Sequence, residues 1–193
     1  TVLLDGVLIE GAITVDAGDM GDVHIAHSTT GPITANASNL AARLRLTRAI
    51  TGPITLAGDG QRFEAADSII ASNAAGDPTA QAVAAEAGEV SFESATVFGT
   101  VKARRIDASN TIFTGVATAA RLQAGCVRYS HVPAGSQTAQ RFRCQPDTAL
   151  QEEKNAANHP SIRLRLTPAF TSTRLGDPGY AQLAPWCAPE IRT

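Results

Sequence analysis

The chain of 193 residues has few of the side chains that mark membrane or nucleic-acid-binding proteins. It contains one Trp, two Tyr and one Met, and no apolar run approaches the ~20 residues needed to cross a bilayer. Sixteen basic and eighteen acidic side chains leave a net charge of −2, so no strong field attracts nucleic acid or anionic lipid. We therefore expect neither a nucleic-acid partner nor a membrane span.

Signatures of catalysis are also missing. The chain has no G-x-S-x-G, G-x-x-x-x-G-K-[ST], H-E-x-x-H or G-x-G-x-x-G motif, the patterns of nucleophile elbows, phosphate loops, zinc proteases and dinucleotide sites. His24 and His27 lie three residues apart on an expected strand, where such positions point to opposite faces and do not form an acid–base pair. No cofactor is predicted.

The three cysteines, Cys126, Cys144 and Cys187, are odd in number. They leave two arrangements open, one disulfide with a free thiol or three reduced thiols. With histidines nearby, they raise a weak zinc alternative in which Cys126, Cys144 and His131 are the ligands. No C-x2-C pair or following H-x3–5-H pair supports it. Buried reduced cysteines are the simplest expectation, and no metal is predicted.

What the chain does contain is an internal repeat. The string Thr-Gly-Pro-Ile-Thr occurs at 30–34 and again at 51–55, an offset of 21 residues, and a weaker copy precedes it at 11–14. A unit of this length is too short to bury its own apolar face. Neighbouring units must therefore stack to make a core.

The repeat is made of strands. Apolar and polar residues alternate in short stretches such as 23–25, 44–46 and 63–65, which is a strand signal. We predict an all-β fold, a right-handed parallel β-helix (β-solenoid) of about six turns over residues 1–123. A β-sandwich is the alternative, and a leucine-rich repeat lacks its consensus. Glycines are expected to supply positive φ at the corners: Gly6, Gly11, Gly18, Gly21, Gly31, Gly52, Gly58 and Gly60.

Stacking predicts ladders of equivalent residues about 4.8 Å apart. Four phenylalanines, Phe63, Phe92, Phe98 and Phe113, are expected to form short aromatic stacks. The alanine- and glycine-rich stretch 73–89 interrupts the repeat, and we expect a loop or short helical excursion there. Insertions in a solenoid lie on one face, often the binding face.

Residues 124–193 differ in composition, with seven of the ten prolines and all three cysteines. We predict a cap packed on the end of the solenoid, because an exposed end edge needs closing. Asp147 is the expected N-cap of a short α-helix through 150–155. Arg163–Thr167 repeats Arg43–Thr47 letter for letter. Two interpretations stay open: this segment is a strand that rejoins the stack, or the match is a coincidence.

One cluster is a weak candidate for catalysis. Asp67 and Asp107, together with Arg104 and Arg105, combine carboxylates with basic side chains. Stacking of turns can bring them to one face, as in sugar-cleaving solenoids. No other group of acidic residues in the repeat supports a shared site.

Residues 1–123 resemble a right-handed parallel β-helix, the architecture of pectate-lyase-like and phage tail-spike proteins. The segments Cys126–Pro133, Arg141–Asp147 and Gly176–Leu183 resemble the C-terminal part of uncharacterised bacterial β-helix proteins. This resemblance implies a bacterial origin and transfers no functional residue. The lyase arrangement of calcium-binding aspartates with a catalytic arginine is not matched.

Two functions are therefore considered. The first is a non-enzymatic structural or interaction module that presents a loop face to a protein partner or to a larger self-assembly. The alternative is a carbohydrate-binding or carbohydrate-cleaving β-helix. Trp186, Tyr129 and Tyr180 all lie in the C-terminal part, so the repeat lacks a platform for sugar rings unless phenylalanines are exposed, which favours the first function. Because the chain begins with Thr1, we expect a fragment or a trimmed chain.

Overall fold

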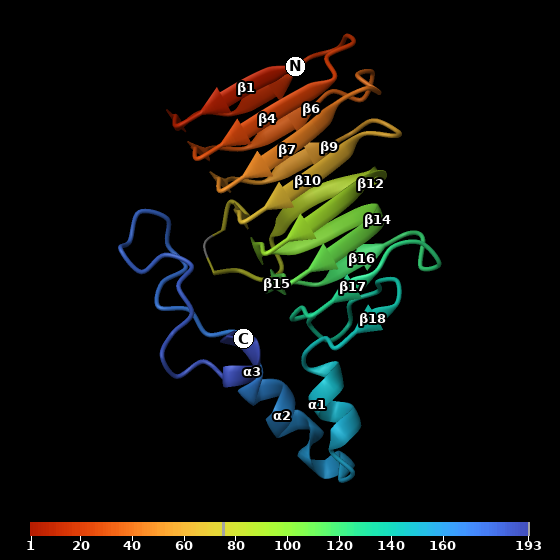
Figure 1. Cartoon of the computed structure of the whole chain (residues 1–193), viewed down its shortest axis with the longest axis vertical. Coiled ribbons are helices and arrows are strands. Elements are labelled where there is room, and N and C mark those ends of the chain that lie inside the picture. The colour runs from red at the N-terminus through yellow and green to blue at the C-terminus, as the bar shows by residue number, and fades with distance from the viewer. Residues whose placement is uncertain (75, 193) are drawn as a thin grey trace.

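The computed structural model describes residues 1–74 and 76–192. It confirms a mostly β chain, with 41% of residues in strands and 10% in helices. The chain winds through a parallel β-solenoid of about six turns, and a few short helices follow near the C-terminus (Figure 1). None of the helices in the described ranges has the length and apolar character that a membrane crossing requires.

Each turn contributes strands to three faces. The first face pairs parallel strands in the order β1, β4, β7, β10, β12, β14, β17 and β18. Long strands β12 and β14 continue around a corner and also contribute to the third face. The strands of the first face are β1 (Val2–Asp5), β4 (Asp22–Ala26), β7 (Arg43–Thr47), β10 (Arg62–Ala66), β12 (Gln81–Glu93), β14 (Thr100–Ser109), β17 (Val127–Arg128) and β18 (Arg141–Phe142).

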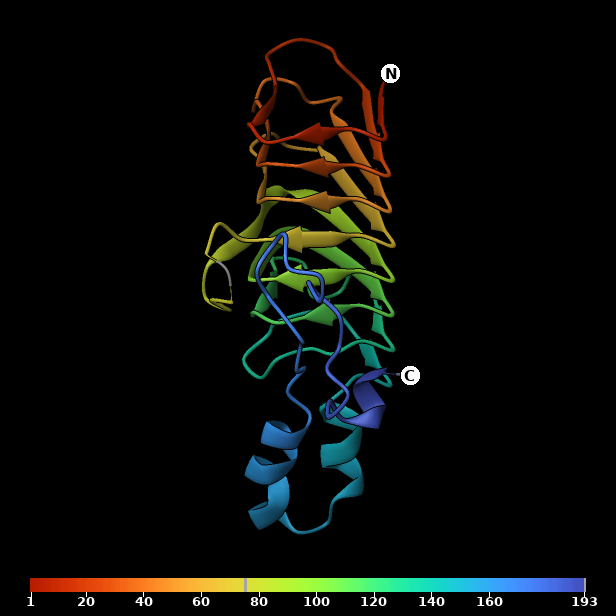
Figure 2. The ribbon, with the colours of Figure 1, turned by 90° about the vertical axis from the view of Figure 1, so that its left-hand side faces the viewer.

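The second and third faces are built from shorter strands. Figure 2 looks onto the second face, whose six strands lie one above another. These are β2 (Leu8–Ile9), β5 (Thr29–Thr30), β8 (Ile50–Thr51), β11 (Ile69–Ala71), β13 (Thr96–Phe98) and β15 (Ile112–Phe113). The third face adds β3 (Ile13–Val15), β6 (Ile33–Ala35), β9 (Ile54–Leu56) and β16 (Ala117–Ala119).

The sequence repeat coincides with the structural repeat. Ile33 pairs with Ile54 in the next turn, and each is only 1% exposed. Gly31 precedes this strand, and a Cβ there would lie 2.5 Å from the carbonyl oxygen of Gly11. The glycine is therefore needed because two turns approach closely. The predicted positive φ is absent at Gly11, Gly21, Gly31, Gly52 and Gly58, and present at Gly6, Gly18 and Gly60.

Residues other than glycine form the left-handed corner between the first and second faces. Seven residues at successive positions along this corner have φ between 46° and 51°, and we call this set the corner column. The backbone amide of each member except the last donates to a carbonyl of the following turn, as from His27 to Thr47 at 3.0 Å. The members are His27, Arg48, Asp67, Ser94, Asn110, Tyr129 and Arg143.

Buried hydroxyls follow the corner column and hold adjacent turns together. Ser68 is 1% exposed, and its Oγ donates to the carbonyl of Ala66 at 2.6 Å and accepts from the amide of Ala49 at 3.1 Å. Ser28 and Ser130 repeat this arrangement in other turns. Because each hydroxyl satisfies two backbone groups, these polar side chains are compatible with the core.

Aromatic stacking is confirmed for three of the four predicted phenylalanines. Phe63, Phe92 and Phe113 are each at most 1% exposed, and successive ring centroids lie 5.8 and 5.5 Å apart, edge to face. Phe98 is the exception, because its ring contacts Phe170 and Tyr180 from the C-terminal part instead. The stack therefore forms the middle of the core, and Phe98 anchors a different element.

The predicted excursion over residues 73–89 is wrong in its second half. Strand β12 begins at Gln81, and Ala82, Val83 and Ala85 are fully buried in the core. Small alanines fit the interior where β12 packs between β9 and β14. Only residues 73–80 leave the stack, with Ala75 outside the described residues.

The parallel ladder continues past the predicted boundary at residue 123. Strand β17 pairs with β14, and β18 pairs with β17. Helix α1 (Asp147–Glu152) confirms a short helix here, but it ends at Glu152 and not at residue 155, Pro146 rather than Asp147 precedes its first residue, and no side chain caps it. The 3-10 helix η1 (Ala156–Asn158) and helix α2 (His159–Arg165) follow.

The chain then returns along the second face. Residues 166–188, which we call the strap, lie beside the solenoid, and α3 (Pro189–Arg192) ends the described chain (Figure 2). Leu166, Cys187 and Ile191 form a small second core with Ile112 of β15. A strand does not rejoin the stack at 163–167, because this segment belongs to α2 and the turn after it. The C-terminal part thus covers a side of the solenoid.

Candidate functional site

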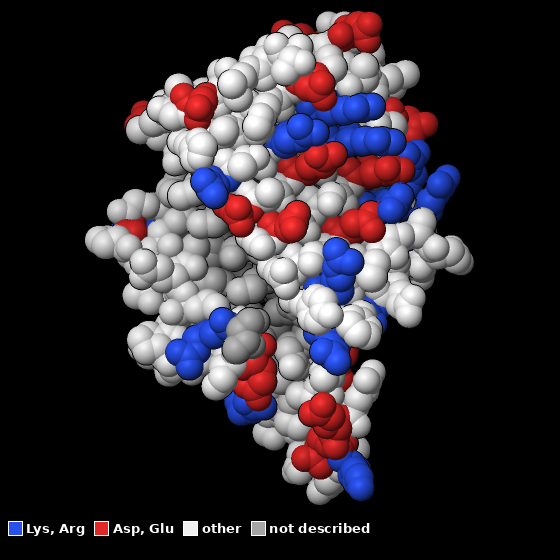
Figure 3. Space-filling view, viewed as in Figure 1, with Lys and Arg blue, Asp and Glu red and all other residues white. Residues whose placement is uncertain are grey.

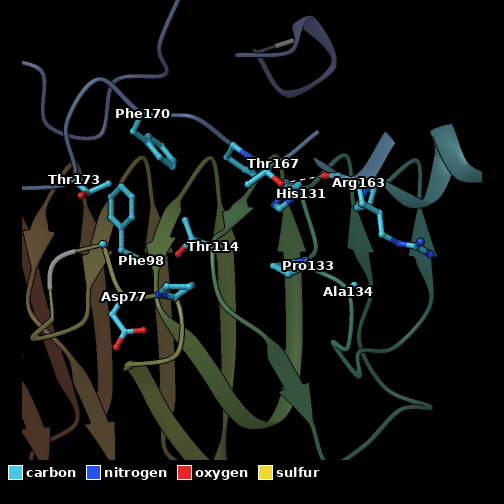
Figure 4. A pocket seen from close by; sticks show the side chains of 14 residues that line it. Asp77, Phe98, Thr114, His131, Pro133, Ala134, Arg163, Thr167, Phe170 and Thr173 are labelled. Carbon is cyan, nitrogen blue, oxygen red and sulfur yellow. Dashed lines mark hydrogen bonds between the residues drawn. The ribbon is translucent and has the colours of Figure 1, made fainter. Parts of the chain in front are cut away.

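The strap and the solenoid enclose a groove of about 350 Å³, which we call the strap groove. Three segments that are distant in sequence form it: the loop at 76–78, the second face near Phe98 and His131, and residues 163–173 (Figure 4). Most of its wall is apolar. Two phenylalanines and four prolines contribute this surface: Phe98, Phe170, Pro78, Pro133, Pro146 and Pro168.

Aromatic contacts hold the strap against the second face. The Phe98 ring lies 4.8 Å from that of Phe170 and 5.8 Å from that of Tyr180, measured between centroids. Burial raises the pKa of Tyr180 to about 12. Tyr180 therefore stays neutral across the physiological range and serves packing.

His131 is the buried polar group of the strap groove. Only 8% of the residue is exposed, and its Nδ1 lies 2.8 Å from the carbonyl oxygen of Phe113. A carbonyl only accepts, so Nδ1 carries the proton and Nε2 is left as an acceptor. Burial lowers the pKa of His131, opposed in part by the Phe113 carbonyl and by the charge of Asp147. The imidazole is therefore neutral at pH 7.

Two threonine hydroxyls of the strap groove are committed to local structure. Thr114 Oγ1 accepts from the amide of Gly99 at 3.0 Å and donates to the carbonyl of Val97 at 3.3 Å. Thr167 Oγ1 donates to the carbonyl of Arg163 at 3.0 Å. A nucleophile needs a base within hydrogen-bond reach. No hydroxyl or thiol of the described residues forms such a pair with His131.

The predicted catalytic cluster does not assemble. Asp107 pairs with Arg105 at 2.8 Å, whereas Arg104 pairs with Asp59 at 2.6 Å and with Glu89 at 3.5 Å. Asp67 sits apart on the corner column, 4.0 Å from Arg48.

On the first face, ion pairs link successive turns. Rows of basic side chains lie beside rows of acidic side chains (Figure 3), and Arg45 pairs with Glu64 at 3.1 Å. Opposite charges on neighbouring strands stabilise a sheet surface. A 220 Å³ depression there is lined by Glu64, Glu89 and Asp107, but an arginine already faces each carboxylate. These charged side chains therefore stabilise the sheet surface through ion pairs and are not free to form a site.

The residues of the zinc alternative, Cys126, Cys144 and His131, are also not arranged as metal ligands. In residues 1–74 and 76–192 no three His, Cys, Asp or Glu side chains are placed to hold a metal ion. All three cysteines are free thiols. Cys144 occupies the position of the buried hydroxyls, with Sγ 3.6 Å from the carbonyl of Phe142, and burial raises the pKa of its thiol. Cys126 is half-buried and Cys187 packs in the second core.

His24 and His27 are both engaged on the surface. His24 Nε2 lies 3.0 Å from Thr47 Oγ1, and His27 Nδ1 lies 3.0 Å from Asp5 Oδ1. Each contact links two successive turns. As expected, the two imidazoles do not act on each other.

Sequence reasoning missed the strap groove, although it singled out some of its signals. The proline-rich C-terminal part and the loop after residue 73 are both visible in the sequence, but no local pattern indicates that they meet. In comparisons with protein-family models, curated proteins and solved structures, nothing matches this chain.

Proposed function

We propose that the chain is a non-enzymatic interaction module that holds an aromatic side chain of a partner protein in the strap groove. The observation that carries this proposal is the groove itself. Its volume of about 350 Å³ is in the range of sites for small organic groups, roughly 300–1,000 Å³. Its walls are aromatic and proline-rich, and it lies where the loop at 76–78 meets the strap.

The side chains that line the strap groove favour a partner aromatic side chain that also carries a hydrogen-bond donor. Phe98 and Phe170 offer ring surfaces, and aromatic groups gain about 0.5–1.5 kcal/mol from such pairing beyond their burial. Neutral His131 offers Nε2 as an acceptor. A tryptophan indole or a tyrosine phenol satisfies both features, and these residues dominate protein interfaces.

Indole, the side chain of tryptophan, is the probe we choose. Ligand-observed NMR should detect indole binding to the intact chain. Ala134→Trp, at an exposed position on the groove wall, should fill the groove and weaken indole binding at least about tenfold, the effect of one well-packed anchor. Ala120→Trp, at an exposed position outside the groove, is the matched control and should bind indole as the parent does.

Indole binding that survives Ala134→Trp, or that is absent from the parent, would contradict the proposal. The catalytic alternative has its own test. Neither the parent nor a variant with alanine at Asp67, Arg104 and Arg105 should cleave polysaccharides. Turnover that the triple variant loses would favour an enzyme.

A further inference from the structure

A second cavity, of about 540 Å³, lies between the corner column and α3. Its wall contains the last four members of the column, Ser94, Asn110, Tyr129 and Arg143, which we call the polar corner. Successive turns lie about 4.8 Å apart. The polar corner therefore presents a row of four side chains, one from each turn.

The two halves of the corner column differ in what their side chains do. In the first half, His27 contacts Asp5 at 3.0 Å and Arg48 lies 4.0 Å from Asp67. In the second half, the side chains of Ser94, Asn110, Tyr129 and Arg143 make no hydrogen bond or ion pair with the described residues. The polar corner thus has donors and acceptors that the fold does not use.

A further unused group lies in the same cavity. Gln145 Oε1 is inaccessible to water and has no hydrogen-bond partner among residues 1–74 and 76–192. An unpaired buried acceptor costs about 1–3 kcal/mol. Because water does not reach this oxygen, a ligand in the cavity does not reach it either, and the free groups that face the cavity are those of the polar corner.

The charge of the cavity favours an anion. Arg143 has its guanidinium over the Phe142 ring, 5.4 Å from the centroid, and no carboxylate neutralises it among the described residues. Arg192 also lines the wall. The nearby carboxylate of Glu190 is already held by Arg165 at 2.8 Å. Because the arginine fork matches a carboxylate in two hydrogen bonds, Arg143 is suited to bind one.

Exposed aromatic rings border this charge. Tyr129 is 49% exposed and Phe142 is 48% exposed, with centroids 5.7 Å apart in an edge-to-face pair. Neighbouring exposed apolar rings are a feature of binding surfaces, and they can cover the apolar face of a sugar ring. The platform that the repeat was expected to lack is present at its end.

We infer that the polar corner is a binding site for a carboxylate-bearing sugar. The carboxylate pairs with Arg143, the sugar hydroxyls bond to Ser94 and Asn110, and the ring lies against Tyr129. Each step uses a group that the fold leaves free. This site is separate from the strap groove and does not depend on its proposed partner.

Glucuronate, glucose and acetate are the probes that test this inference. Titration of the intact chain, followed by NMR, should show glucuronate binding tighter than either glucose or acetate. Arg143→Leu keeps a side chain with the same backbone restriction and should weaken glucuronate binding roughly tenfold or more, the effect of a charged hydrogen bond. Arg121→Leu, at an exposed arginine outside the cavity, is the matched control and should have no effect.

Three results would overturn the inference. The first is absence of glucuronate binding. The second is acetate binding as tightly as glucuronate, because acetate needs only a positive charge. The third is an equal loss of glucuronate affinity in Arg143→Leu and Arg121→Leu. Unchanged resonances of core methyl groups should accompany Arg143→Leu. If that variant does not fold, Asn110→Ala replaces it, and glucuronate binding that is unaffected by Asn110→Ala would then overturn the inference.

Discussion

The segments Arg43–Thr47 and Arg163–Thr167 have the same five residues and adopt different structures. The first is strand β7, in which Leu44 and Leu46 are 4% and 0% exposed. The second ends helix α2, where Leu164 is 78% exposed and Leu166 is fully buried. In a strand, residues two apart share a face, whereas in a helix they do not.

Neighbouring elements account for the difference. Strand β7 lies between β4 and β10, and both supply backbone partners for every residue of the segment. No strand of the described residues pairs with the second copy, and it follows Pro160 in the first turn of α2. Proline there pre-sets a helical φ, and Leu and Arg are good helix formers. The five residues are compatible with either a strand or a helix, and pairing with neighbouring strands of the solenoid determines which one forms.

The largest expected effect on stability comes from truncating a buried leucine of the first copy. Leu46→Ala should lower the free energy of unfolding by about 3 kcal/mol, because it opens a cavity in the core. Leu164→Ala should change it by less than about 0.5 kcal/mol, because that side chain is in solvent. Urea unfolding of both variants measures the difference. Equal losses would mean that Leu164 is also buried in a core.

An intermediate effect is expected from acid. The folded-state pKa of His131 is lowered by burial, so the unfolded state binds a proton first as the pH falls below the unfolded value of about 6.5. The stability from the buried neutral imidazole is complete above that pH and is lost as the pH falls toward the folded pKa. Hydrogen exchange should show the strap and the second copy opening in acid before β7 does. His131→Asn should remove this pH dependence; its persistence would locate the titrating group elsewhere.

The smallest effects concern the third residue of each copy. Arg45 pairs with Glu64 at 3.1 Å and Arg165 pairs with Glu190 at 2.8 Å, and both pairs are substantially exposed. Exposed pairs contribute about 0–1 kcal/mol and weaken with salt. Arg45→Ala and Arg165→Ala should each fall in this range, with the difference from the parent shrinking in 1 M salt, as seen in thermal unfolding. A loss above about 2 kcal/mol that salt leaves unchanged would indicate a desolvated pair.

Most of the solenoid could be predicted, because its repeat is local and periodic. The match at 30–34 and 51–55 corresponds to adjacent turns, and the alternation at 44–46 marks buried leucines. Strand β12 was missed at its start because Ala82 and Ala85 resemble loop composition, although both are fully buried. Burial of alanine depends on neighbouring turns, which a short window does not contain.

The strap groove and the polar corner could not be predicted for a different reason. The strap has no period, and its position depends on contacts such as that between Phe98 and Phe170. The corner column uses residues other than glycine at positive φ, a conformation that L-residues adopt at a cost. Hydrogen bonds to the next turn hold that conformation, so no single residue type marks it.

The strap also changes how the protein would respond to force. A plain stack of turns is nearly one-dimensional, and its repeats can detach one after another from a free end. Here the strap and α3 contact two successive turns at once, at Phe98 in β13 and at Ile112 in β15. Tension on the first turns would peel them singly, whereas the turns behind the strap would rupture as one block.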